Sequence, residues 1–371
     1  MSAGASDRTE RSAPGLRLVA PPARLADAPA PGWAHIARLS DDVGLLEHAR
    51  HAIARREHGY CVDDVSRGLL VAARETQPTA QVVRLAERYL AFLTHAQGAD
   101  GGFRNRLGYD RRWLDEPSTG DWWGRALWGL GTAAARSTVP WIRRAAREAF
   151  ELGARQRSAW SRAMAFAGLG AAEVLRAHPR DAAAAHLLAD AATVVGTPGS
   201  DPAWVWPEPD LTYANPALAE VLIAAGDLLG DEPLLGDGLR MLDWLCDMQD
   251  HHGRLSTVPV GGWRPGVPRH RYDQQPIEAA ATADACATAA AVTGDERWDD
   301  ALMQAINWFL GDNDAGTVMY DPLTGGGYDG LKPDGPNVNQ GAESTLALLA
   351  TLQHARRLAS RGATRPSGGL A

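Results

Sequence analysis

Apolar residues recur at spacings of three and four along most of this chain, and strand-like alternation is nearly absent. The periodic segments are rich in Ala, Leu, Arg and Glu, which favour helices. Asp, Ser or Asn caps and breaks at Gly or Pro mark the ends of each segment. The pattern predicts helices over residues 42–57, 62–75, 79–97, 121–136, 139–155, 159–176, 180–194, 215–230, 233–250, 274–293, 296–311 and 340–360.

The connections between these segments alternate in length. Short joints such as 76–78 and 230–233 are separated by long segments that are loaded with Gly, Pro, Trp, Tyr and charge. The long segments are 98–120, 195–214, 251–273 and 312–339. Loops of this length in a compact domain are usually functional or disordered, and their aromatic content argues against disorder. We therefore expect helices that run up and down, with the functional face on the long-loop side.

Taken in pairs, the helices divide into an outer and an inner set. The outer set is 42–57, 79–97, 139–155, 180–194, 233–250 and 296–311, and the other six segments are inner. The inner set is richer in Ala and Gly, which lets backbones crowd around a central axis. Six hairpins close a ring, so the sequence predicts an all-α fold, an (α/α)6 barrel over residues 32–360. Residues 1–31 and 361–371 are expected to be disordered tails.

Composition and charge narrow the class of protein. Hydrophobic residues make up 45% of the 371 and the net charge is -8, which indicates a globular protein that does not bind nucleic acid. The three cysteines lack the spacing of a disulfide framework or a zinc site. Neither a membrane-spanning run nor a signal peptide is predicted, so we expect a cytoplasmic protein. No nucleotide motif is present, and we expect no cofactor and no metal; the oligomeric state is left open.

The first turns of the inner helices form the candidate site, because helix N-termini favour polar and anionic groups. Asp63, Asp121, Asn215, Asp273 and Asn339 suit N-cap positions, which is the simplest explanation for several of them. Capping does not explain a second layer of polar residues among apolar neighbours. This layer is Asp64, Arg67, Arg125, Glu278 and Glu343.

Carboxyl groups in these turns suggest glycoside hydrolysis, which needs one carboxyl to protonate the leaving oxygen and another to activate water or attack the sugar. Ala and Gly around Glu278 and Glu343 imply partial burial, which raises a carboxyl pKa and suits a general acid. We therefore expect Glu278 or Glu343 as the acid. Asp64, Asp121 or Asp273 would be the base.

Aromatic residues add to the case for a carbohydrate substrate. The chain has 13 Trp against 7 Tyr and 5 Phe, and flat rings stack on sugar faces. The alternatives are that Trp only anchors the loops, and that the charged loop 103–117 is a salt-bridged lid without ligand contact. The expected substrate-binding residues are Tyr60, Arg67, Tyr109, Asp110, Arg111, Arg112, Trp113, Trp122, Trp123, Arg125, Trp263, Gln274, Gln275, Asn339 and Gln340.

Four motifs carry a resemblance to a known superfamily. They are Tyr60–Asp64, Tyr109–Glu116, Asp273–Ala280 and Asn339–Thr345. These motifs resemble those of bacterial proteins in the six-hairpin glycosidase-like superfamily, some of which carry the label glycosyltransferase. The resemblance covers about residues 42–358 and implies an (α/α)6 toroid.

Other functions remain open beside hydrolysis. A sugar 2-epimerase or isomerase on the same toroid would need a histidine pair, and the inner helices are short of histidine. A non-catalytic glycan-binding or scaffold protein would use the same pocket. The Asp63–Asp64 pair also suggests a terpene-cyclase-like toroid. A cyclase needs an apolar cavity, however, and the candidate site at the starts of the inner helices is too rich in Arg, Asp and Asn.

Overall fold

The computed structural model describes residues 28–364, and most of this part of the chain is helical. The expected tails lie largely outside it, since residues 1–27 and 365–371 are not described. The helices are α1 (Ala34–Leu39), α2 (Val62–Ala73), α3 (Ala80–Ala96), α4 (Asp121–Arg136), α5 (Pro140–Gly153), α6 (Ser161–Ala177), α7 (Ala182–Val195), α8 (Pro216–Leu229), α9 (Glu232–Gln249), α10 (Pro276–Thr293), α11 (Arg297–Leu310) and α12 (Ala342–Thr364).

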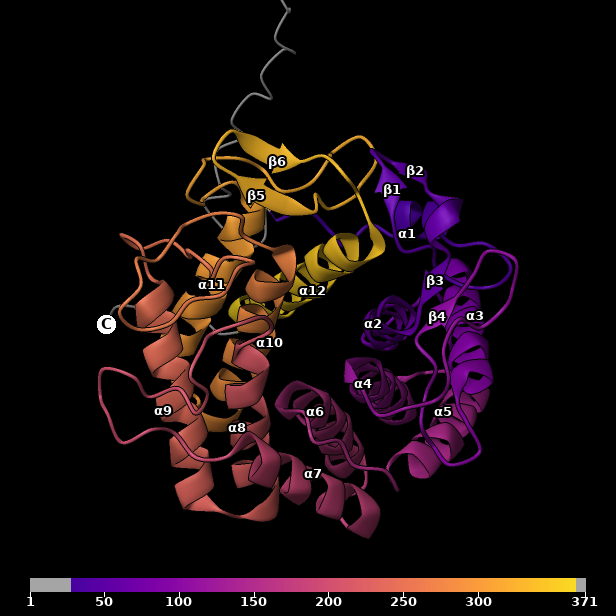
Figure 1. Cartoon of the computed structure of the whole chain (residues 1–371), viewed down its shortest axis with the longest axis horizontal. Coiled ribbons are helices and arrows are strands. Elements are labelled where there is room, and N and C mark those ends of the chain that lie inside the picture. Colours follow the sequence, from indigo (N-terminus) through magenta and orange to yellow (C-terminus); the bar gives the residue numbers. More distant parts are fainter. Residues whose placement is uncertain (1–27, 365–371) are drawn as a thin grey trace, which may run out of the picture.

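Six of these helices form a closed inner ring. Each of α2, α4, α6, α8, α10 and α12 packs against the next, and α12 packs against α2. Figure 1 looks down the molecule and shows α2, α4 and α6 nearly end on, close to the centre. These are the six inner helices that the sequence predicts, so the (α/α)6 fold class is confirmed.

The outer helices α3, α5, α7, α9 and α11 each pack against the inner helix that precedes them in the chain. Side chains cap three of them at the short-loop end, where Thr79, Asp181 and Asp231 accept bonds from backbone N–H groups of the first turn. Gly230 and Gly294, with φ of 71° and 69°, end α8 and α10 in the left-handed region. These local signals explain why the short joints were predictable.

The prediction of a first outer helix over residues 42–57 is wrong. Among the outer helices its place is taken by the shorter α1, which packs against α12. Residues 42–57 instead form bends, two short strands and the start of a 3-10 helix, and their backbone bonds to distant parts of the chain. Asn339 Oδ1 accepts from the N–H of Ala49 at 3.0 Å, and Glu47 O accepts from the N–H of Ala342 at 3.0 Å. These tertiary bonds outweigh the helical periodicity of the segment.

Short antiparallel strand pairs stitch the loops together. They are β1 (Ala49–Arg50) with β2 (Ile53–Ala54), β3 (Tyr60–Cys61) with β4 (Arg106–Leu107), and β5 (Gly330–Lys332) with β6 (Gly335–Asn337). The β3–β4 pair places Cys61 opposite Arg106 at the start of α2. Within residues 28–364, no helix is long and apolar enough to span a membrane.

Glycines let the inner helices approach one another closely. A Cβ on Gly170 in α6 would collide with the carbonyl oxygen of Leu127 in α4, and one on Gly129 would lie 2.6 Å from that of Ser66 in α2. Real Cβ atoms do not approach backbone oxygens so closely. The contact between neighbouring inner helices therefore depends on residues without a side chain.

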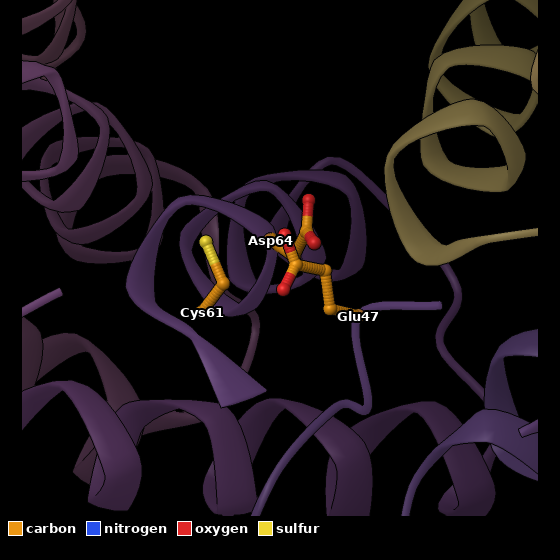
Figure 2. A group of neighbouring side chains, drawn as sticks. All are labelled: Glu47, Cys61 and Asp64. Atoms are coloured by element: carbon orange, nitrogen blue, oxygen red, sulfur yellow. The ribbon is translucent and has the colours of Figure 1, made fainter. Parts of the chain in front are cut away.

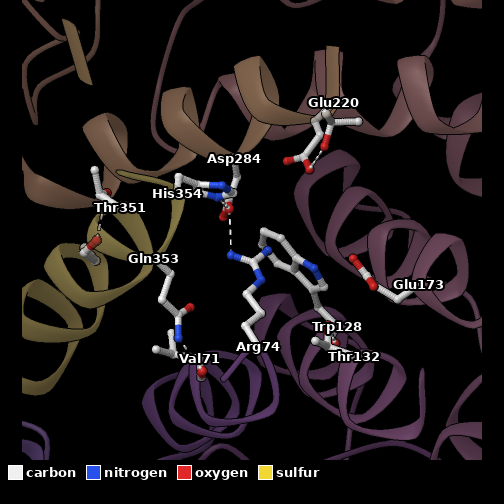
Figure 3. Close-up of polar contacts among 12 residues, drawn as sticks. Val71, Arg74, Trp128, Thr132, Glu173, Glu220, Asp284, Thr351, Gln353 and His354 are labelled. Atoms are coloured by element: carbon white, nitrogen blue, oxygen red, sulfur yellow. Dashed lines mark hydrogen bonds and ion pairs between the residues drawn. The ribbon is translucent and has the colours of Figure 1, made fainter. Parts of the chain in front are cut away.

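A buried polar network joins the inner helices near their C-terminal ends (Figure 3). Arg74 Nη1 donates to Asp284 Oδ1 at 2.6 Å, and His354 Nε2 contacts the same oxygen at 2.6 Å. Gln353 Nε2 donates to the carbonyl oxygen of Val71 at 2.9 Å. The network links α2, α10 and α12, which are the helices where the last part of the ring meets the first.

Candidate active site

The main cavity, of about 930 Å³, opens at the N-terminal ends of the inner helices, where the long loops gather. Its lining combines the first turns of four inner helices with residues from the loops. The lining residues are Glu47, His48, Cys61, Asp63, Asp64, Arg67, Asn105, Arg106, Gly120, Asp121, Trp122, Ala159, Trp160, Ser161, Arg162, Glu208, Thr212, Tyr213, Gln275, Asp329, Gly341 and Glu343. The main cavity therefore lies on the long-loop side, which the sequence predicts to be the functional face.

The expectation that polar residues cap these inner helices is wrong. The N-cap residues of α2, α4 and α10 are Cys61, Gly120 and Gln275, and none makes a side-chain cap bond. Asn215 holds the N-cap position of α8, but its Oδ1 accepts from the N–H of Thr212 at 3.0 Å rather than from α8. Asp63, Asp121, Asp273 and Asn339 lie outside the N-cap positions of their helices. Uncapped first turns leave backbone N–H groups directed toward the cavity end.

Arg67 joins two carboxyl groups of the cavity wall. Its Nη1 lies 2.7 Å from Asp64 Oδ1 and its Nη2 lies 2.8 Å from Glu343 Oε2. Burial raises the pKa of Asp64 to about 8, the negative charges of Glu343 and Glu47 act in the same direction, and Arg67 opposes them. Asp64 is therefore a carboxyl group of the cavity wall whose surroundings favour its protonated form more than water does.

Asp64 also belongs to a compact cluster at the start of α2, with Glu47 and Cys61 (Figure 2). One ligand atom from each of these three residues lies within 4.8 Å of the others. This spacing would suit a metal ion, but Glu47 is ion-paired with Arg106 and Asp64 with Arg67. Two guanidinium groups at the cluster would repel a cation. Burial also raises the pKa of the Cys61 thiol, which keeps it protonated.

The opposite wall is organised by Arg162 in α6. Its Nη1 donates to both carboxylate oxygens of Glu208, at 2.9 and 2.8 Å, and its Nε donates to the carbonyl oxygen of Tyr213 at 2.6 Å. Its Nη2 donates to Asn215 Oδ1 at 3.1 Å. These bonds hold the long loop before α8 against the cavity, and so place Glu208 and Tyr213 in its lining.

Two tryptophans and an aspartate of the lining come from the starts of α4 and α6. Burial raises the pKa of Asp121 above its usual value, while Arg125 opposes the shift. Trp122 is fixed by a bond from Nε1 to the carbonyl oxygen of Phe103 at 2.7 Å. The side chain of Trp160 is 69% exposed, so its ring is available to a ligand in the cavity.

Glu278, an expected acid, is buried and does not line the cavity. The N–H of Ala214 donates to its Oε1, and Asn215 Nδ2 donates to its Oε2 at 3.2 Å. Burial raises the pKa of Glu278 to about 7, and both hydrogen bonds oppose the shift. The carboxyl group thus fixes the segment that precedes α8. Asp273, an expected base, also lies outside the lining, and its carbonyl oxygen accepts from Val260 at 2.9 Å.

Several expected substrate-binding residues serve the packing of the loops. Tyr60 is buried and its hydroxyl donates to Asp41 at 2.6 Å. Gln274 accepts from Trp308 Nε1 at 2.7 Å, and Gln340 accepts from Thr324 at 2.6 Å. Asn339 Nδ2 donates to Asp329 Oδ2 at 2.9 Å. Their amides and hydroxyl are therefore occupied by the protein itself.

The other expected substrate-binding residues, which are aromatic or charged, lie in different parts of the structure. Trp123 is buried, and half-buried Trp113 packs on Phe92 and His95. The Arg125 guanidinium lies 3.6 Å from the ring centre of Phe166, deeper on the barrel axis, and burial lowers its pKa to about 9. Tyr109, Asp110, Arg111 and Arg112 lie outside the main cavity, and Trp263 lies in a neighbouring groove.

The loop 103–117 contributes both to an ion pair on the surface and to the wall of the main cavity. Arg111 Nη2 lies 2.7 Å from Asp42 Oδ2 on the exposed surface, as a salt-bridged lid would require. Asn105 and Arg106 of the same loop nevertheless line the cavity, because Asp115 accepts from their N–H groups at 2.6 and 2.9 Å.

Sequence reasoning missed Glu47, Arg106, Glu208 and Asp329 in the lining. Glu208 and Asp329 lie in the long loops that the sequence predicts to be functional, so their charge within these loops was a usable signal. Glu47 offered no such signal, because its segment has the periodicity of a helix.

The sequence matches no protein-family model and no curated protein. Solved structures do resemble the chain. A sugar epimerase from a ruminal bacterium has a TM-score of 0.66 at 12% identity, over 91% of this chain and 97% of that one. Cellobiose 2-epimerase from Spirochaeta thermophila has a TM-score of 0.65 at 13% identity, over 87% and 93%.

A third structure comes from a different class of enzyme. It is a C. cellulolyticum cellulase in complex with cellobiose, with a TM-score of 0.57 at 11% identity, over 85% of this chain and 88% of that one. At these identities the likeness concerns the fold. The chain therefore has the (α/α)6 toroid fold that it shares with these epimerases and this cellulase.

Proposed function

We propose that this protein is a carbohydrate-active enzyme that hydrolyses a glycosidic bond in the main cavity. The observation that carries the proposal is the set of three carboxyl groups, Asp64, Asp121 and Glu343, that line one cavity, where burial raises the pKa of Asp64. A proton donor and a second carboxyl group are the two parts that glycoside hydrolysis needs. The likeness to epimerases and to a cellulase supports a sugar substrate, and the open faces of Trp160 and Trp122 suit sugar rings.

In this proposal Asp64 donates its proton to the glycosidic oxygen as the bond to the anomeric carbon breaks. Asp121 or Glu343 takes a proton from water, and the water oxygen attacks the anomeric carbon. The proton later returns to Asp64, so the enzyme is restored. The acid role moves from Glu278, whose carboxyl group is occupied by Ala214 and Asn215, to a residue that faces the cavity.

Epimerisation is the second candidate, because two of the similar structures are sugar epimerases. Removal and return of a proton at a sugar carbon needs two acid–base groups, for which histidines are suited. Among the lining residues, all of them within the described range, His48 is the one histidine. The shortage of histidines in the lining favours hydrolysis over epimerisation.

A direct assay separates the candidates. The protein is incubated with cellobiose, mannobiose and longer oligomers, and the products are followed by proton NMR. Hydrolysis produces new reducing ends, whose first-formed anomer also reports inversion or retention. Epimerisation leaves the number of reducing ends unchanged and produces a diastereomer. Binding without any product would identify a glycan-binding protein and overturn the proposal.

A further inference from the structure

A second groove of about 370 Å³ lies beside the main cavity, between the loops that precede α8 and α10. Thr212 lines both spaces, so the groove adjoins the cavity rather than lying on a remote surface. Trp263 and Tyr272 contribute rings to the groove, and Asp210, Arg264 and His270 contribute polar groups.

The groove is built by contacts between the two loops. The N–H of Leu211 donates to the carbonyl oxygen of Trp263 at 2.7 Å, and the N–H of Trp263 donates to that of Leu211 at 2.9 Å. The indole of Trp263 is held by a bond from Nε1 to Val267 O at 2.8 Å and by the ring of Trp204, with centroids 5.5 Å apart. A ligand would therefore meet a ring that is already oriented.

The chemistry of the groove fits a sugar ring. The indole N–H of Trp263 is already bonded, so the ring offers an apolar surface of the kind that sugar C–H groups contact. The Tyr272 hydroxyl and the His270 ring have no hydrogen-bond partner among the described residues, so both are available to hydroxyl groups. A few polar groups beside an apolar wall are typical of a small-molecule site.

We propose that this groove binds a sugar unit of the same glycan whose scissile bond lies in the main cavity. The inference rests on the proposed function and deepens it, because it names the substrate class. A protein with two adjoining sugar sites would act on an oligosaccharide or polysaccharide, in preference to a monosaccharide derivative or a disaccharide.

The test compares chain lengths. We expect wild type to have a higher kcat/KM on cellohexaose or mannohexaose than on the matching disaccharide, and Trp263→Ala to reduce the hexamer-to-dimer ratio about tenfold. Trp141→Ala is the matched control, because Trp141 is 62% exposed on the outer helix α5 and bonds to Glu87 there. The control should leave the ratio unchanged. An unchanged ratio in folded Trp263→Ala overturns the inference.

Two further measurements cover other outcomes. If Trp263→Ala unfolds, Tyr272→Phe and His270→Ala test the same groove, and unchanged ratios in both variants count against it. Calorimetry with cellohexaose and mannohexaose on Asp64→Asn measures binding without turnover. Trp263-dependent binding of a hexamer by a protein that hydrolyses nothing supports the groove and refutes hydrolysis. Hydrolysis without any preference for chain length does the reverse.

Discussion

Two neighbouring aspartates at the start of α2 have different surroundings. Asp64 is 3% exposed and lies between Arg67 and the cluster of Glu47 and Cys61. Asp63 is more exposed and accepts a weak bond from the Cys61 thiol at 3.6 Å. Burial is what raises the pKa of Asp64, whereas a sequence shows only that two acids are adjacent.

The first prediction concerns the pH dependence of catalysis. A general acid must be protonated, so kcat/KM should fall as the pH rises through about 8, the pKa of Asp64. Asp64→Asn should reduce kcat/KM by roughly a hundredfold or more and remove this limb of the profile. Rates from pH 5 to 10 check both points, with exposed Asp300→Asn as the control. Full activity in Asp64→Asn would exclude it as the acid.

The second prediction concerns stability and Glu278. Its pKa in the folded protein is raised from 4.5 to about 7, so the folded state binds this proton more tightly than the unfolded state does. The stabilisation is fully present below pH 4.5 and is lost as the pH rises to about 7; it amounts to about 3 kcal/mol.

Urea unfolding at pH 4.5 and pH 8 measures this loss. Glu278→Gln cannot ionise, so its free energy of unfolding should change less between the two pH values than that of wild type. Glu232→Gln, on the exposed face of α9, is the control and should behave like wild type. Parallel changes in wild type and Glu278→Gln would show that Glu278 does not titrate in this range.

At the scale of single residues, the sequence predicted those cavity-lining residues that regular helices position. Asp64, Arg67, Asp121, Trp122 and Glu343 line the cavity because they lie in the first turns of inner helices. Glu47 and Glu208 also line it, but ion pairs with arginines from other elements place them there. Such placement depends on contacts distant in sequence, which periodicity does not contain.

At the scale of elements, the inner helices are predictable because their caps, breaks and apolar spacing are local. The segment 42–57 has the same local signals and is not a helix. Its polar backbone groups bond to Asn339, Gln340 and Ala342, at the other end of the chain. Local propensity is a weak prior, and here a tertiary partner that satisfies the backbone prevails.

The third prediction contrasts two helical glycines. Gly170→Ala should destabilise the protein by about 1–3 kcal/mol, because the new methyl group meets the backbone of α4. Gly236→Ala on α9 should stabilise it by about 0.5–1 kcal/mol, because nothing lies within 4 Å of the added atom. Chemical unfolding of both variants checks the signs. A tolerated Gly170→Ala would mean that α4 and α6 can separate easily.

At the scale of the whole molecule, six inner helices were predictable as a ring, but the contacts that close it were not. Arg74 and Asp284 are 210 residues apart in the sequence, and no local signal marks them as partners. Burial opposes ionisation of Asp284, but Arg74 and His354 outweigh it and hold its pKa below the usual range. The closing contact is therefore a buried ion pair between α2 and α10, supported from α12.

The fourth prediction tests this closing network. Asp284→Ala leaves the buried guanidinium of Arg74 without its partner, and should lower the free energy of unfolding by about 3–5 kcal/mol. Asp227→Asn is the control, because this exposed residue lines the same end of the barrel. Thermal and urea unfolding measure both variants. A small effect in Asp284→Ala would show that the network adds little to ring closure.

The ring is closed between α2 and α12, and the main cavity takes lining residues from Glu47 to Glu343. During translation, a ribosome-bound chain that ends before α12 lacks both Glu343 and the last inner helix. Such a nascent chain leaves α2 and α10 without the inner helix that packs against both of them. Activity should therefore appear only after residue 343 leaves the exit tunnel, whereas the hairpins before it can begin to pack earlier.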